Sequence, residues 1–464
     1  MRCARRVDPD PIPRTRRTGR TPHQHHEESA MPNPAGHDMP DPTHDLLFAR
    51  SPDSGTLPLS GVRVVDLTQV GAGPYCTSLL GDLGADVIKV EPLEGDTFRY
   101  VDDAFGEGES AYFFGVNRSK RSIALNLRSE RGFEVLTRLL KEADVFAVAF
   151  RPDAVRRMGM DYESLRKIND RLIYCSITAF GEAGPRAHLP GMDILAQAMS
   201  GIMGVTGEID GGPVKVGVPI ADFVASYLLG FGVCAALRLR DRTGHGDKVM
   251  VNLLDGMIAS FANYLTVYDK TCVAFRRQGG GHPQLVPYQP FLGSDGKHFV
   301  LACMNDKFWQ KMLPLLDRYG DFHDPRFASN TGRVTHRAQL CSRLEAIFAT
   351  QPAGYWLAEI EAAGVPCGPI HALEDAVEDP QVIANESLAT LNHPIHGAYR
   401  VPNNPIRFAE ALTGPRGYAP ALGEHTTEIL REAGFDAAEI ASLTNTGIAR
   451  EALTPRRNHT KATS

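Results

Sequence analysis

The chain has 464 residues, of which 43% are hydrophobic and 22% charged, and its formal net charge is −6 at pH 7. This length can bury more than one hydrophobic core and predicts two or three domains. Beyond the first twenty positions the basic residues are scattered, so the charge pattern argues against a nucleic-acid partner.

The first 58 residues are rich in proline and polar side chains and have almost no apolar periodicity. Such a segment cannot bury enough surface to offset its ordering entropy. Residues 1–58 are therefore predicted to form a disordered tail. Its histidines are typical of a polar tract rather than of a metal site, and no metal centre is predicted.

The eight cysteines lie far apart, with no Cys-x-x-Cys pair and no Cys/His set of zinc-site spacing. They are predicted to be reduced thiols. This favours a cytoplasmic protein.

From Leu59 onward, apolar runs alternate with amphipathic stretches. The predicted strands span residues 62–68, 87–90, 122–127, 145–150, 172–178 and 248–252, and the early helices span 75–83, 131–142 and 154–158. Alternation of this kind predicts an α/β fold with a parallel sheet and helices on both faces.

The segment from Lys215 to Asp222 leads into a long apolar helix predicted over 220–238. Proline suits the first helical position, so Pro219 is expected to mark the start and Asp222 to lie in the first turn. There the helix dipole favours the ionised carboxylate, which could attack an activated carbonyl. The alternative is that Asp222 only completes the helix start.

The segment from Val216 to Leu237 approaches the length of a membrane span. Its carboxylate, Pro219 and two glycines, Gly230 and Gly232, favour a buried helix packed closely against its neighbours. No membrane span is predicted.

After residue 265 the pattern changes. A loop at 278–283 precedes an antiparallel hairpin predicted over 286–291 and 299–302, and helices are expected over 307–316 and 337–349. These elements predict a second, smaller α+β domain.

Several polar positions compete for a chemical role. Gly71-x-Gly73 follows a strand, but Cys76 replaces the third glycine of a dinucleotide motif, so nicotinamide or flavin binding is not favoured. Asp193 opens a helix predicted over 194–203 and either caps it or acts in catalysis. The run Gly279, Gly280 and Gly281 is either a linker or a source of backbone donors for an oxyanion.

A series of blocks resembles the class III coenzyme A transferase family. The blocks are Leu59–Thr68, Ala72–Pro74, Leu83–Glu91, Asn117–Leu125, Phe150–Pro152, Arg157–Gly159 and Leu422–Thr426, and the match runs from about Leu59 to about Thr446. Several blocks in this order are far more specific than any one of them.

The resemblance implies two chains interlocked like links, as a homodimer. Each chain has a Rossmann-like large domain built from both chain ends, expected over 59–265 and 400–453, and a small domain over 266–399. The implied substrates are acyl-CoA and carboxylic acids, so coenzyme A enters as a thioester substrate and no permanently bound cofactor is expected.

By motif position, the family's nucleophile is Asp222, which would form a mixed anhydride and then an aspartyl-CoA thioester. The resemblance further implies a CoA site and a glycine loop, Gly279–Gly281, that closes over the intermediates. The implied CoA-site residues are Val70, Gly71, Ala72, Leu125, Arg128, Phe150, Arg157 and Met158.

Three departures bear on the substrate. Pro92, Ala149 and His282 differ from the pattern of formyl-CoA transferase, which argues against oxalate and formyl-CoA as the pair. Residues 286–289 resemble relatives that use succinyl-CoA or similar dicarboxylate thioesters. Two alternatives stay open: an α-methylacyl-CoA racemase using Asp193, and a non-catalytic CoA-binding relative.

Overall fold

The computed structural model describes residues 57–106 and 109–452. The disordered tail predicted for residues 1–58 lies, up to residue 56, outside the described residues.

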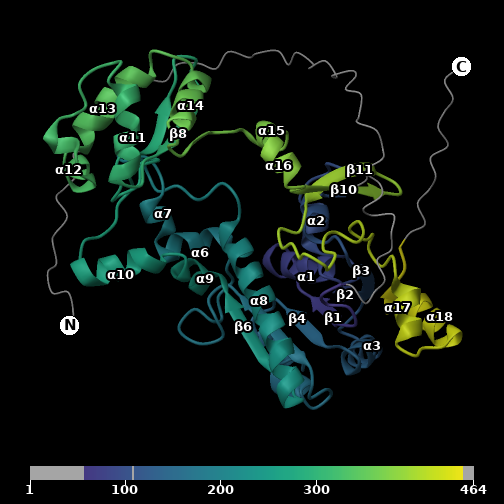
Figure 1. Ribbon diagram of the computed structural model, residues 1–464. Helices are drawn as coiled ribbons and strands as arrows, with labels where there is room; N and C mark the ends of the chain where they lie inside the picture. Colours follow the sequence, from purple (N-terminus) through teal and green to yellow (C-terminus); the bar gives the residue numbers. More distant parts are fainter. Residues whose placement is uncertain (1–56, 107–108, 453–464) are drawn as a thin grey trace, which may run out of the picture.

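The largest element is a seven-stranded sheet with the order β12-β3-β2-β1-β4-β5-β6 (Figure 1). Its strands are β1 (Arg63–Leu67), β2 (Asp86–Glu91), β3 (Arg121–Leu125), β4 (Val145–Val148), β5 (Ile173–Thr178), β6 (Lys248–Asn252) and β12 (Ala449–Arg450). The first six are parallel, and β12 pairs antiparallel with β3. The predicted Rossmann-like parallel sheet is confirmed, and the end of the chain contributes its edge strand.

Helices cover both faces of this sheet, as the alternating pattern predicts. In chain order, the helices of this part of the chain are α1 (Ala72–Asp82), α2 (Ala111–Val116), α3 (Glu130–Lys141), α4 (Pro152–Arg157), α5 (Tyr162–Leu165), α6 (Asp193–Ser200), α7 (Ile202–Val205), α8 (Ile220–Thr243) and α9 (Leu253–Ala259). The next helix, α10 (Ala262–Thr271), has no buried residue and does not cover the sheet. Near the C-terminus follow α17 (Thr426–Glu432) and α18 (Ala437–Asn445). A short 3-10 helix, η3, spans Thr97–Tyr100.

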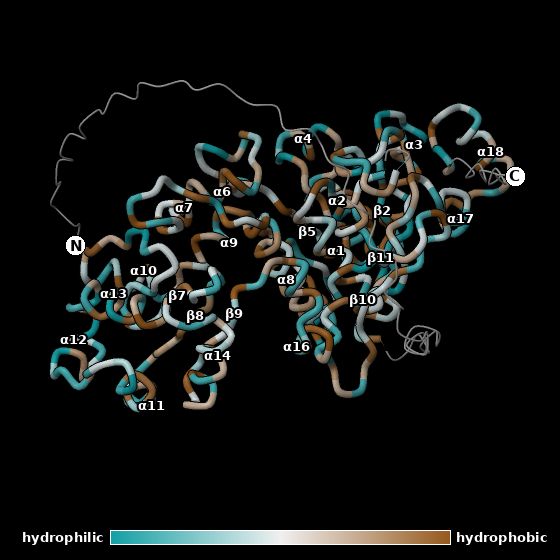
Figure 2. Tube along the Cα trace, turned by 90° about the horizontal axis from the view of Figure 1, so that it is seen from above, coloured by the Kyte–Doolittle hydropathy of each residue, from teal (hydrophilic) through white to brown (hydrophobic). Residues whose placement is uncertain are grey.

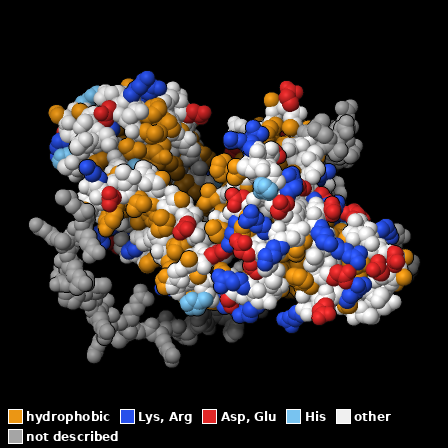
Figure 3. All heavy atoms as spheres, turned by 90° about the horizontal axis from the view of Figure 1, so that it is seen from below, with side chains coloured by type: hydrophobic (Ala, Val, Ile, Leu, Met, Phe, Trp, Pro, Cys, Tyr) orange, Lys and Arg blue, Asp and Glu red, His pale blue; other side chains and the backbone are white. Residues whose placement is uncertain are grey.

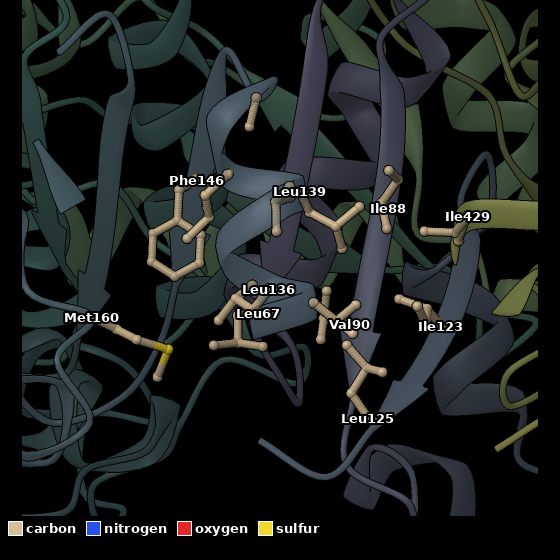
Figure 4. Close-up of a cluster of buried hydrophobic side chains, with 14 of the residues drawn as sticks. Leu67, Ile88, Val90, Ile123, Leu125, Leu136, Leu139, Phe146, Met160 and Ile429 are labelled. Atoms are coloured by element: carbon tan, nitrogen blue, oxygen red, sulfur yellow. The ribbon is translucent and has the colours of Figure 1, made fainter. Parts of the chain in front are cut away.

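Two hydrophobic cores flank the sheet because successive side chains of a strand point to opposite faces. Val65 of β1 packs with α3, α17 and α18, and its neighbour Val64 packs with α1 and α8. Figure 4 shows the first core, with Phe146 and Leu136 pointing toward one another between β4 and α3.

A second structural unit has its own core. It contains β7 (Tyr288–Leu292), β8 (His298–Ala302), β9 (Cys367–Pro369), α11 (Asp306–Leu316), η4 (Pro325–Phe327), α12 (Asn330–Thr335), α13 (Arg337–Phe348) and α14 (Ala353–Ala362). Trp309 and Trp356 are fully buried in its centre. Seen from above, this unit and the seven-stranded sheet lie side by side, with α6 and α9 between them (Figure 2).

The chain returns to the large sheet through α15 (Leu373–Ala376), α16 (Pro380–Ala384) and a hairpin of β10 (Leu388–His393) and β11 (Gly397–Pro402). This hairpin was not predicted from the sequence. The single helix expected over 194–203 is also divided, because Gly201 adopts a left-handed φ of 97° and separates α6 from α7.

Six described cysteines are free thiols: Cys76, Cys175, Cys234, Cys303, Cys341 and Cys367. The thiol prediction is confirmed for these six and not for Cys272, which is disulfide-bonded. Among the described helices, α8 is long and apolar enough to cross a membrane by length and composition, and one third of its most apolar window is buried. The expectation of a deeply buried helix is therefore only partly met.

Phe146→Ala tests the core between β4 and α3. Phe146 is fully buried, so the cavity should cost about 3–5 kcal/mol, seen by calorimetry as a lower thermal midpoint. The exposed control Val101→Ala should stay within about 0.5 kcal/mol of wild type. Equal midpoints for the two variants would contradict the packing described.

Candidate active site

The candidate site lies at the carboxyl edge of the parallel sheet. β1 pairs with β2 on one side and with β4 on the other. The strand order thus reverses between β1 and β4, and in open α/β sheets ligands bind in the crevice at such a point.

A tight turn after β1 forms one wall of this point. Val70 in the turn has a φ of 71°, a conformation that β-branched residues rarely adopt. Its N–H group donates to Asp96 Oδ1 at 3.2 Å. Lys89 Nζ donates both to Asp96 Oδ2 at 2.9 Å and to the carbonyl oxygen of Thr68 at 3.0 Å. The buried ion pair between Lys89 and Asp96 therefore fixes the backbone of the turn at Thr68 and Val70.

A second buried ion pair supports the same turn. The carboxylate of Asp66, fully buried, accepts hydrogen bonds from the backbone and hydroxyl of Thr68 and from Thr77. Lys120 Nζ lies 2.9 Å from Asp66 Oδ2. These bonds and the neighbouring charges outweigh the desolvation of Asp66 and lower its pKa to about 2, so it stays ionised.

Asp222 is the third residue of α8 and faces the turn. Pro219 is the N-cap residue of α8. The sequence predicted it as the first helical residue, which is Ile220 instead. A Cβ atom placed on Gly71 would lie 2.6 Å from Asp222 Oδ2, so only glycine leaves room for this carboxylate. Ser226 Oγ donates to the carbonyl oxygens of Ala72 and Asp222 at 2.6 and 2.7 Å and joins α8 to the turn.

The pKa of Asp222 is raised to about 7, first by burial and second by the charge of Asp193. The sequence predicted that the helix start favours the ionised carboxylate, whereas the pKa is shifted toward the neutral acid. Desolvation and a like charge favour the neutral form, and here they outweigh the helix dipole.

Asp193 opens α6 and is bonded to the start of α8. Its Oδ1 accepts the N–H of Ala221 at 2.8 Å, and its Oδ2 accepts Gln197 Nε2 at 2.7 Å. The structure thus brings Asp193 and Asp222 together. A further acidic residue, Asp255, is bonded to Asn252 at the start of α9.

The predicted CoA-site residues lie along the same edge of the sheet. Val70, Gly71 and Ala72 form the turn after β1, while Phe150 follows β4, and Arg157 and Met158 end α4. The Arg157 side chain is 69% exposed and pairs with Asp153.

Leu125 is the last residue of β3, and Arg128 lies in the turn that follows this strand. Arg128 is exposed. Leu125 is 1% exposed and packs in the hydrophobic core, so its side chain does not face a ligand in this arrangement.

The glycine loop contacts other elements. The N–H of Gly279 donates to the carbonyl oxygen of Gly207 at 3.1 Å. A Cβ on Gly280 would lie 2.4 Å from Pro290 Cδ, so the loop packs tightly on β7. Its neighbours are thus the end of α7 and β7, and its oxyanion role stays a prediction.

A separate cluster brings ligand atoms of Glu109, His393 and His396 within 4.8 Å of one another. The two imidazole rings stack with centroids 4.6 Å apart. His393 Nδ1 accepts N–H groups from Ile395 and His396, which assigns the proton of a neutral ring to Nε2. Stacked rings with this tautomer fit a hydrogen-bonded contact between the hairpin and Glu109 better than a metal site.

Sequence reasoning missed the residues that support Asp222 and the turn. Ser226 and Gln197 gave no signal, because their partners come from other elements. Lys89 and Glu91 did give one, since these charged residues alternate with apolar ones in the part of β2 that is buried. Such residues require buried partners.

Comparisons with known proteins show the family to which the chain belongs. The family model described as CoA-transferase family III matches residues 59–426. The chain is 39% identical over 398 residues to the succinyl-CoA:glutarate CoA-transferase of Mus musculus, which covers 84% of this chain and 90% of the relative. It is 38% identical over 379 residues to the acetyl-CoA:oxalate CoA-transferase of Acetobacter aceti, covering 81% and 95%.

A solved structure supports the same assignment. A CAIB/BAIF family protein from Brucella suis matches with a TM-score of 0.73 and 40% identity, covering 82% of this chain and all of that one, 100%. The chain belongs to CoA-transferase family III.

Proposed function

We propose that this CoA-transferase moves coenzyme A between two carboxylic acids, with Asp222 as the covalent carrier. The observation that carries the proposal is the position of its carboxylate, partly buried in the first turn of α8 and against the bare backbone of Gly71. A nucleophile held at the switch point of the sheet can meet a thioester bound there.

The proposed reaction conserves charge at each step. An Asp222 oxygen bonds to the acyl carbon of the donor thioester, the C–S bond breaks, and its electron pair leaves with the CoA thiolate. The thiolate then attacks the aspartyl carbonyl of the mixed anhydride and releases the donor acid. The resulting aspartyl-CoA thioester reacts with the acceptor carboxylate by the same two steps in reverse.

Backbone amides are suited to stabilise the oxyanions of these steps. α1 begins at Ala72, directly after Gly71, so the unpaired amides of its first turn lie at the same edge as Asp222. We propose that Gly279, Gly280 and Gly281 add donors when the substrate is bound. Asp222 and these amides supply the nucleophile and the oxyanion donors of each step.

We propose a dicarboxylate thioester such as succinyl-CoA as donor, supported by the relative named for succinyl-CoA and glutarate. Three arginines on the carboxyl edge, Arg128, Arg151 and Arg157, are exposed and can meet the phosphates of CoA.

We also propose a homodimer in which the chains interlock. α10 has no buried residue, and Phe231 of α8, Met250 of β6 and Val273 are 76%, 58% and 67% exposed. Figure 3 shows hydrophobic side chains gathered over the left and central parts of one face, and charged ones over the right part. Exposed apolar surface of this extent is typical of a protein interface.

Trapping tests the covalent role of Asp222. Incubation with succinyl-CoA followed by hydroxylamine should modify Asp222, because anhydrides and thioesters react with this amine, and peptide mass spectrometry would locate the change. Asp222→Ala should lower transfer by about 10⁴-fold while CoA still raises the thermal midpoint.

Turnover without modification at Asp222 would reject the proposal. Deuterium uptake at the α-carbon of a 2-methylacyl-CoA, without an acceptor acid, would indicate the racemase alternative. Binding of CoA without exchange for any acid would indicate a non-catalytic relative.

The raised pKa predicts how acylation depends on pH. Only the ionised carboxylate is nucleophilic, so kcat/KM for adduct formation should rise with pH and level off above about 7. At pH 6 the rate should be about tenfold below the plateau. Rapid-quench measurement of the adduct between pH 5.5 and 8.5 would check this, and a flat profile would contradict it.

Phe231→Asp tests the homodimer. A charge at this exposed apolar position should weaken an interface over α8, since an unpaired buried charge is costly. Sedimentation velocity should show dimers for wild type and for the control Lys167→Asp, and monomers for Phe231→Asp. A monomeric wild-type chain would reject the dimer.

A further inference from the structure

We propose that Asp193 is the positioning residue for Asp222: from the first turn of α6, its carboxylate fixes the first turn of α8 and places a second negative charge beside the nucleophile. The catalytic role of Asp193 rests on the proposed function of Asp222 as nucleophile. The hydrogen bonds by which Asp193 positions Asp222 are independent of that function.

The first link is a cap across two helices. Asp193 Oδ1 accepts the N–H of Ala221 at 2.8 Å, one of the amides that α8 cannot satisfy within itself. Ala221 directly precedes Asp222. Because the bond fixes the backbone next to the nucleophile, a shift of Asp193 would move the Asp222 carboxylate relative to Gly71.

The second link runs through Gln197, which is fully buried in α6. Gln197 Nε2 donates to Asp193 Oδ2 at 2.7 Å, and Gln197 Oε1 accepts the N–H of Val216 at 2.9 Å. Asp193 is thus held on both oxygens, and the approach to α8 is fixed at Val216 and at Ala221.

Asp193 is the charged group that raises the pKa of Asp222, and the other titratable groups nearby are neutral or paired elsewhere. Tyr75 on α1 has its pKa raised to about 12, chiefly by burial, and is neutral. On the other neighbouring elements, Asp255 of α9 is bonded to Asn252, and Lys248 of β6 is paired with Glu182. Burial and Asp193 are the causes that raise the pKa of Asp222.

Two like charges close together favour the acylated enzyme. In the free enzyme the Asp222 carboxylate is repelled by Asp193. On acylation its negative charge leaves with the CoA thiolate, and Asp222 becomes a neutral anhydride or thioester. The repulsion is then relieved, so Asp193 both positions the nucleophile and makes its carboxylate more basic and more reactive.

Asp193→Asn tests this role because asparagine keeps an oxygen for Ala221 N–H and loses the charge. The inflection of adduct formation should move to lower pH by about one unit, and the plateau rate should fall by about tenfold. Asp241→Asn removes the same charge from the exposed far end of α8 and should change neither. Gln197→Leu keeps the charge, so it should lower the plateau rate while the inflection stays closer to that of wild type.

A stability cycle measures the same coupling without any catalysis. Asp222 gains protons on folding, because its folded pKa exceeds the unfolded one, so its ionisation lowers stability as the pH rises from about 4 to about 7. Asp222→Asn should therefore raise the thermal midpoint at pH 8 by about 3 °C more than at pH 5. In an Asp193→Asn background this difference should shrink.

An unchanged difference in that background, or an unchanged pH profile, would overturn the role of Asp193. If the cycle shows coupling and no adduct forms at Asp222, the positioning of Asp222 by Asp193 stands and the covalent role fails. The two proposals are thus tested separately.

Discussion

The close approach of the Asp222 carboxylate to the backbone of Gly71 is the constraint on which the site depends. A Cβ at Gly71 would be 2.6 Å from Asp222 Oδ2. Both partners must be held firmly, because backbone and carboxylate have little room to move. The turn is held by the pairs Lys89–Asp96 and Asp66–Lys120, all buried, and α8 by Ser226 and Asp193.

These supports explain why charged side chains lie inside the protein. Buried ion pairs seldom add net stability compared with apolar packing. Here they hold Thr68 and Val70 in a turn with a left-handed φ at a β-branched residue, which apolar packing alone does not fix. The free-energy cost of burying these charges is thus offset by no extra stability, but it fixes the backbone geometry of the site.

The electrostatics of Asp222 follow from competition between three effects. The start of α8 favours the anion, whereas burial and Asp193 favour the acid and raise its pKa. A carboxylate that is costly to keep ionised is a more basic nucleophile, and its acylation removes the cost. The start of α8, burial and the carboxylate of Asp193 thus all act on the ionisation of the Asp222 carboxylate.

Much of the fold could be predicted from the sequence, because the strands of the large sheet are short apolar runs and helices such as α3 are amphipathic. The division at Gly201 and the β10–β11 hairpin were missed, since a left-handed glycine and a late antiparallel pair have weak local signals. Asp222 and Gly71 were both predicted as site residues. Their contact, and the direction of the Asp222 pKa, depend on burial and on Asp193 in another helix, which local sequence does not specify.

Transfer of oxygen would test the central claim most directly. If the acceptor acid carries ¹⁸O in its carboxylate, the acid forms an anhydride with Asp222 and leaves one labelled oxygen on it when CoA attacks the acceptor acyl group. After one turnover with succinyl-CoA, the tryptic peptide of residues 216–238 should gain the mass of one ¹⁸O, located at Asp222, and continued turnover should exchange the second oxygen of the same carboxylate. A peptide that stays unlabelled after many turnovers would contradict the account.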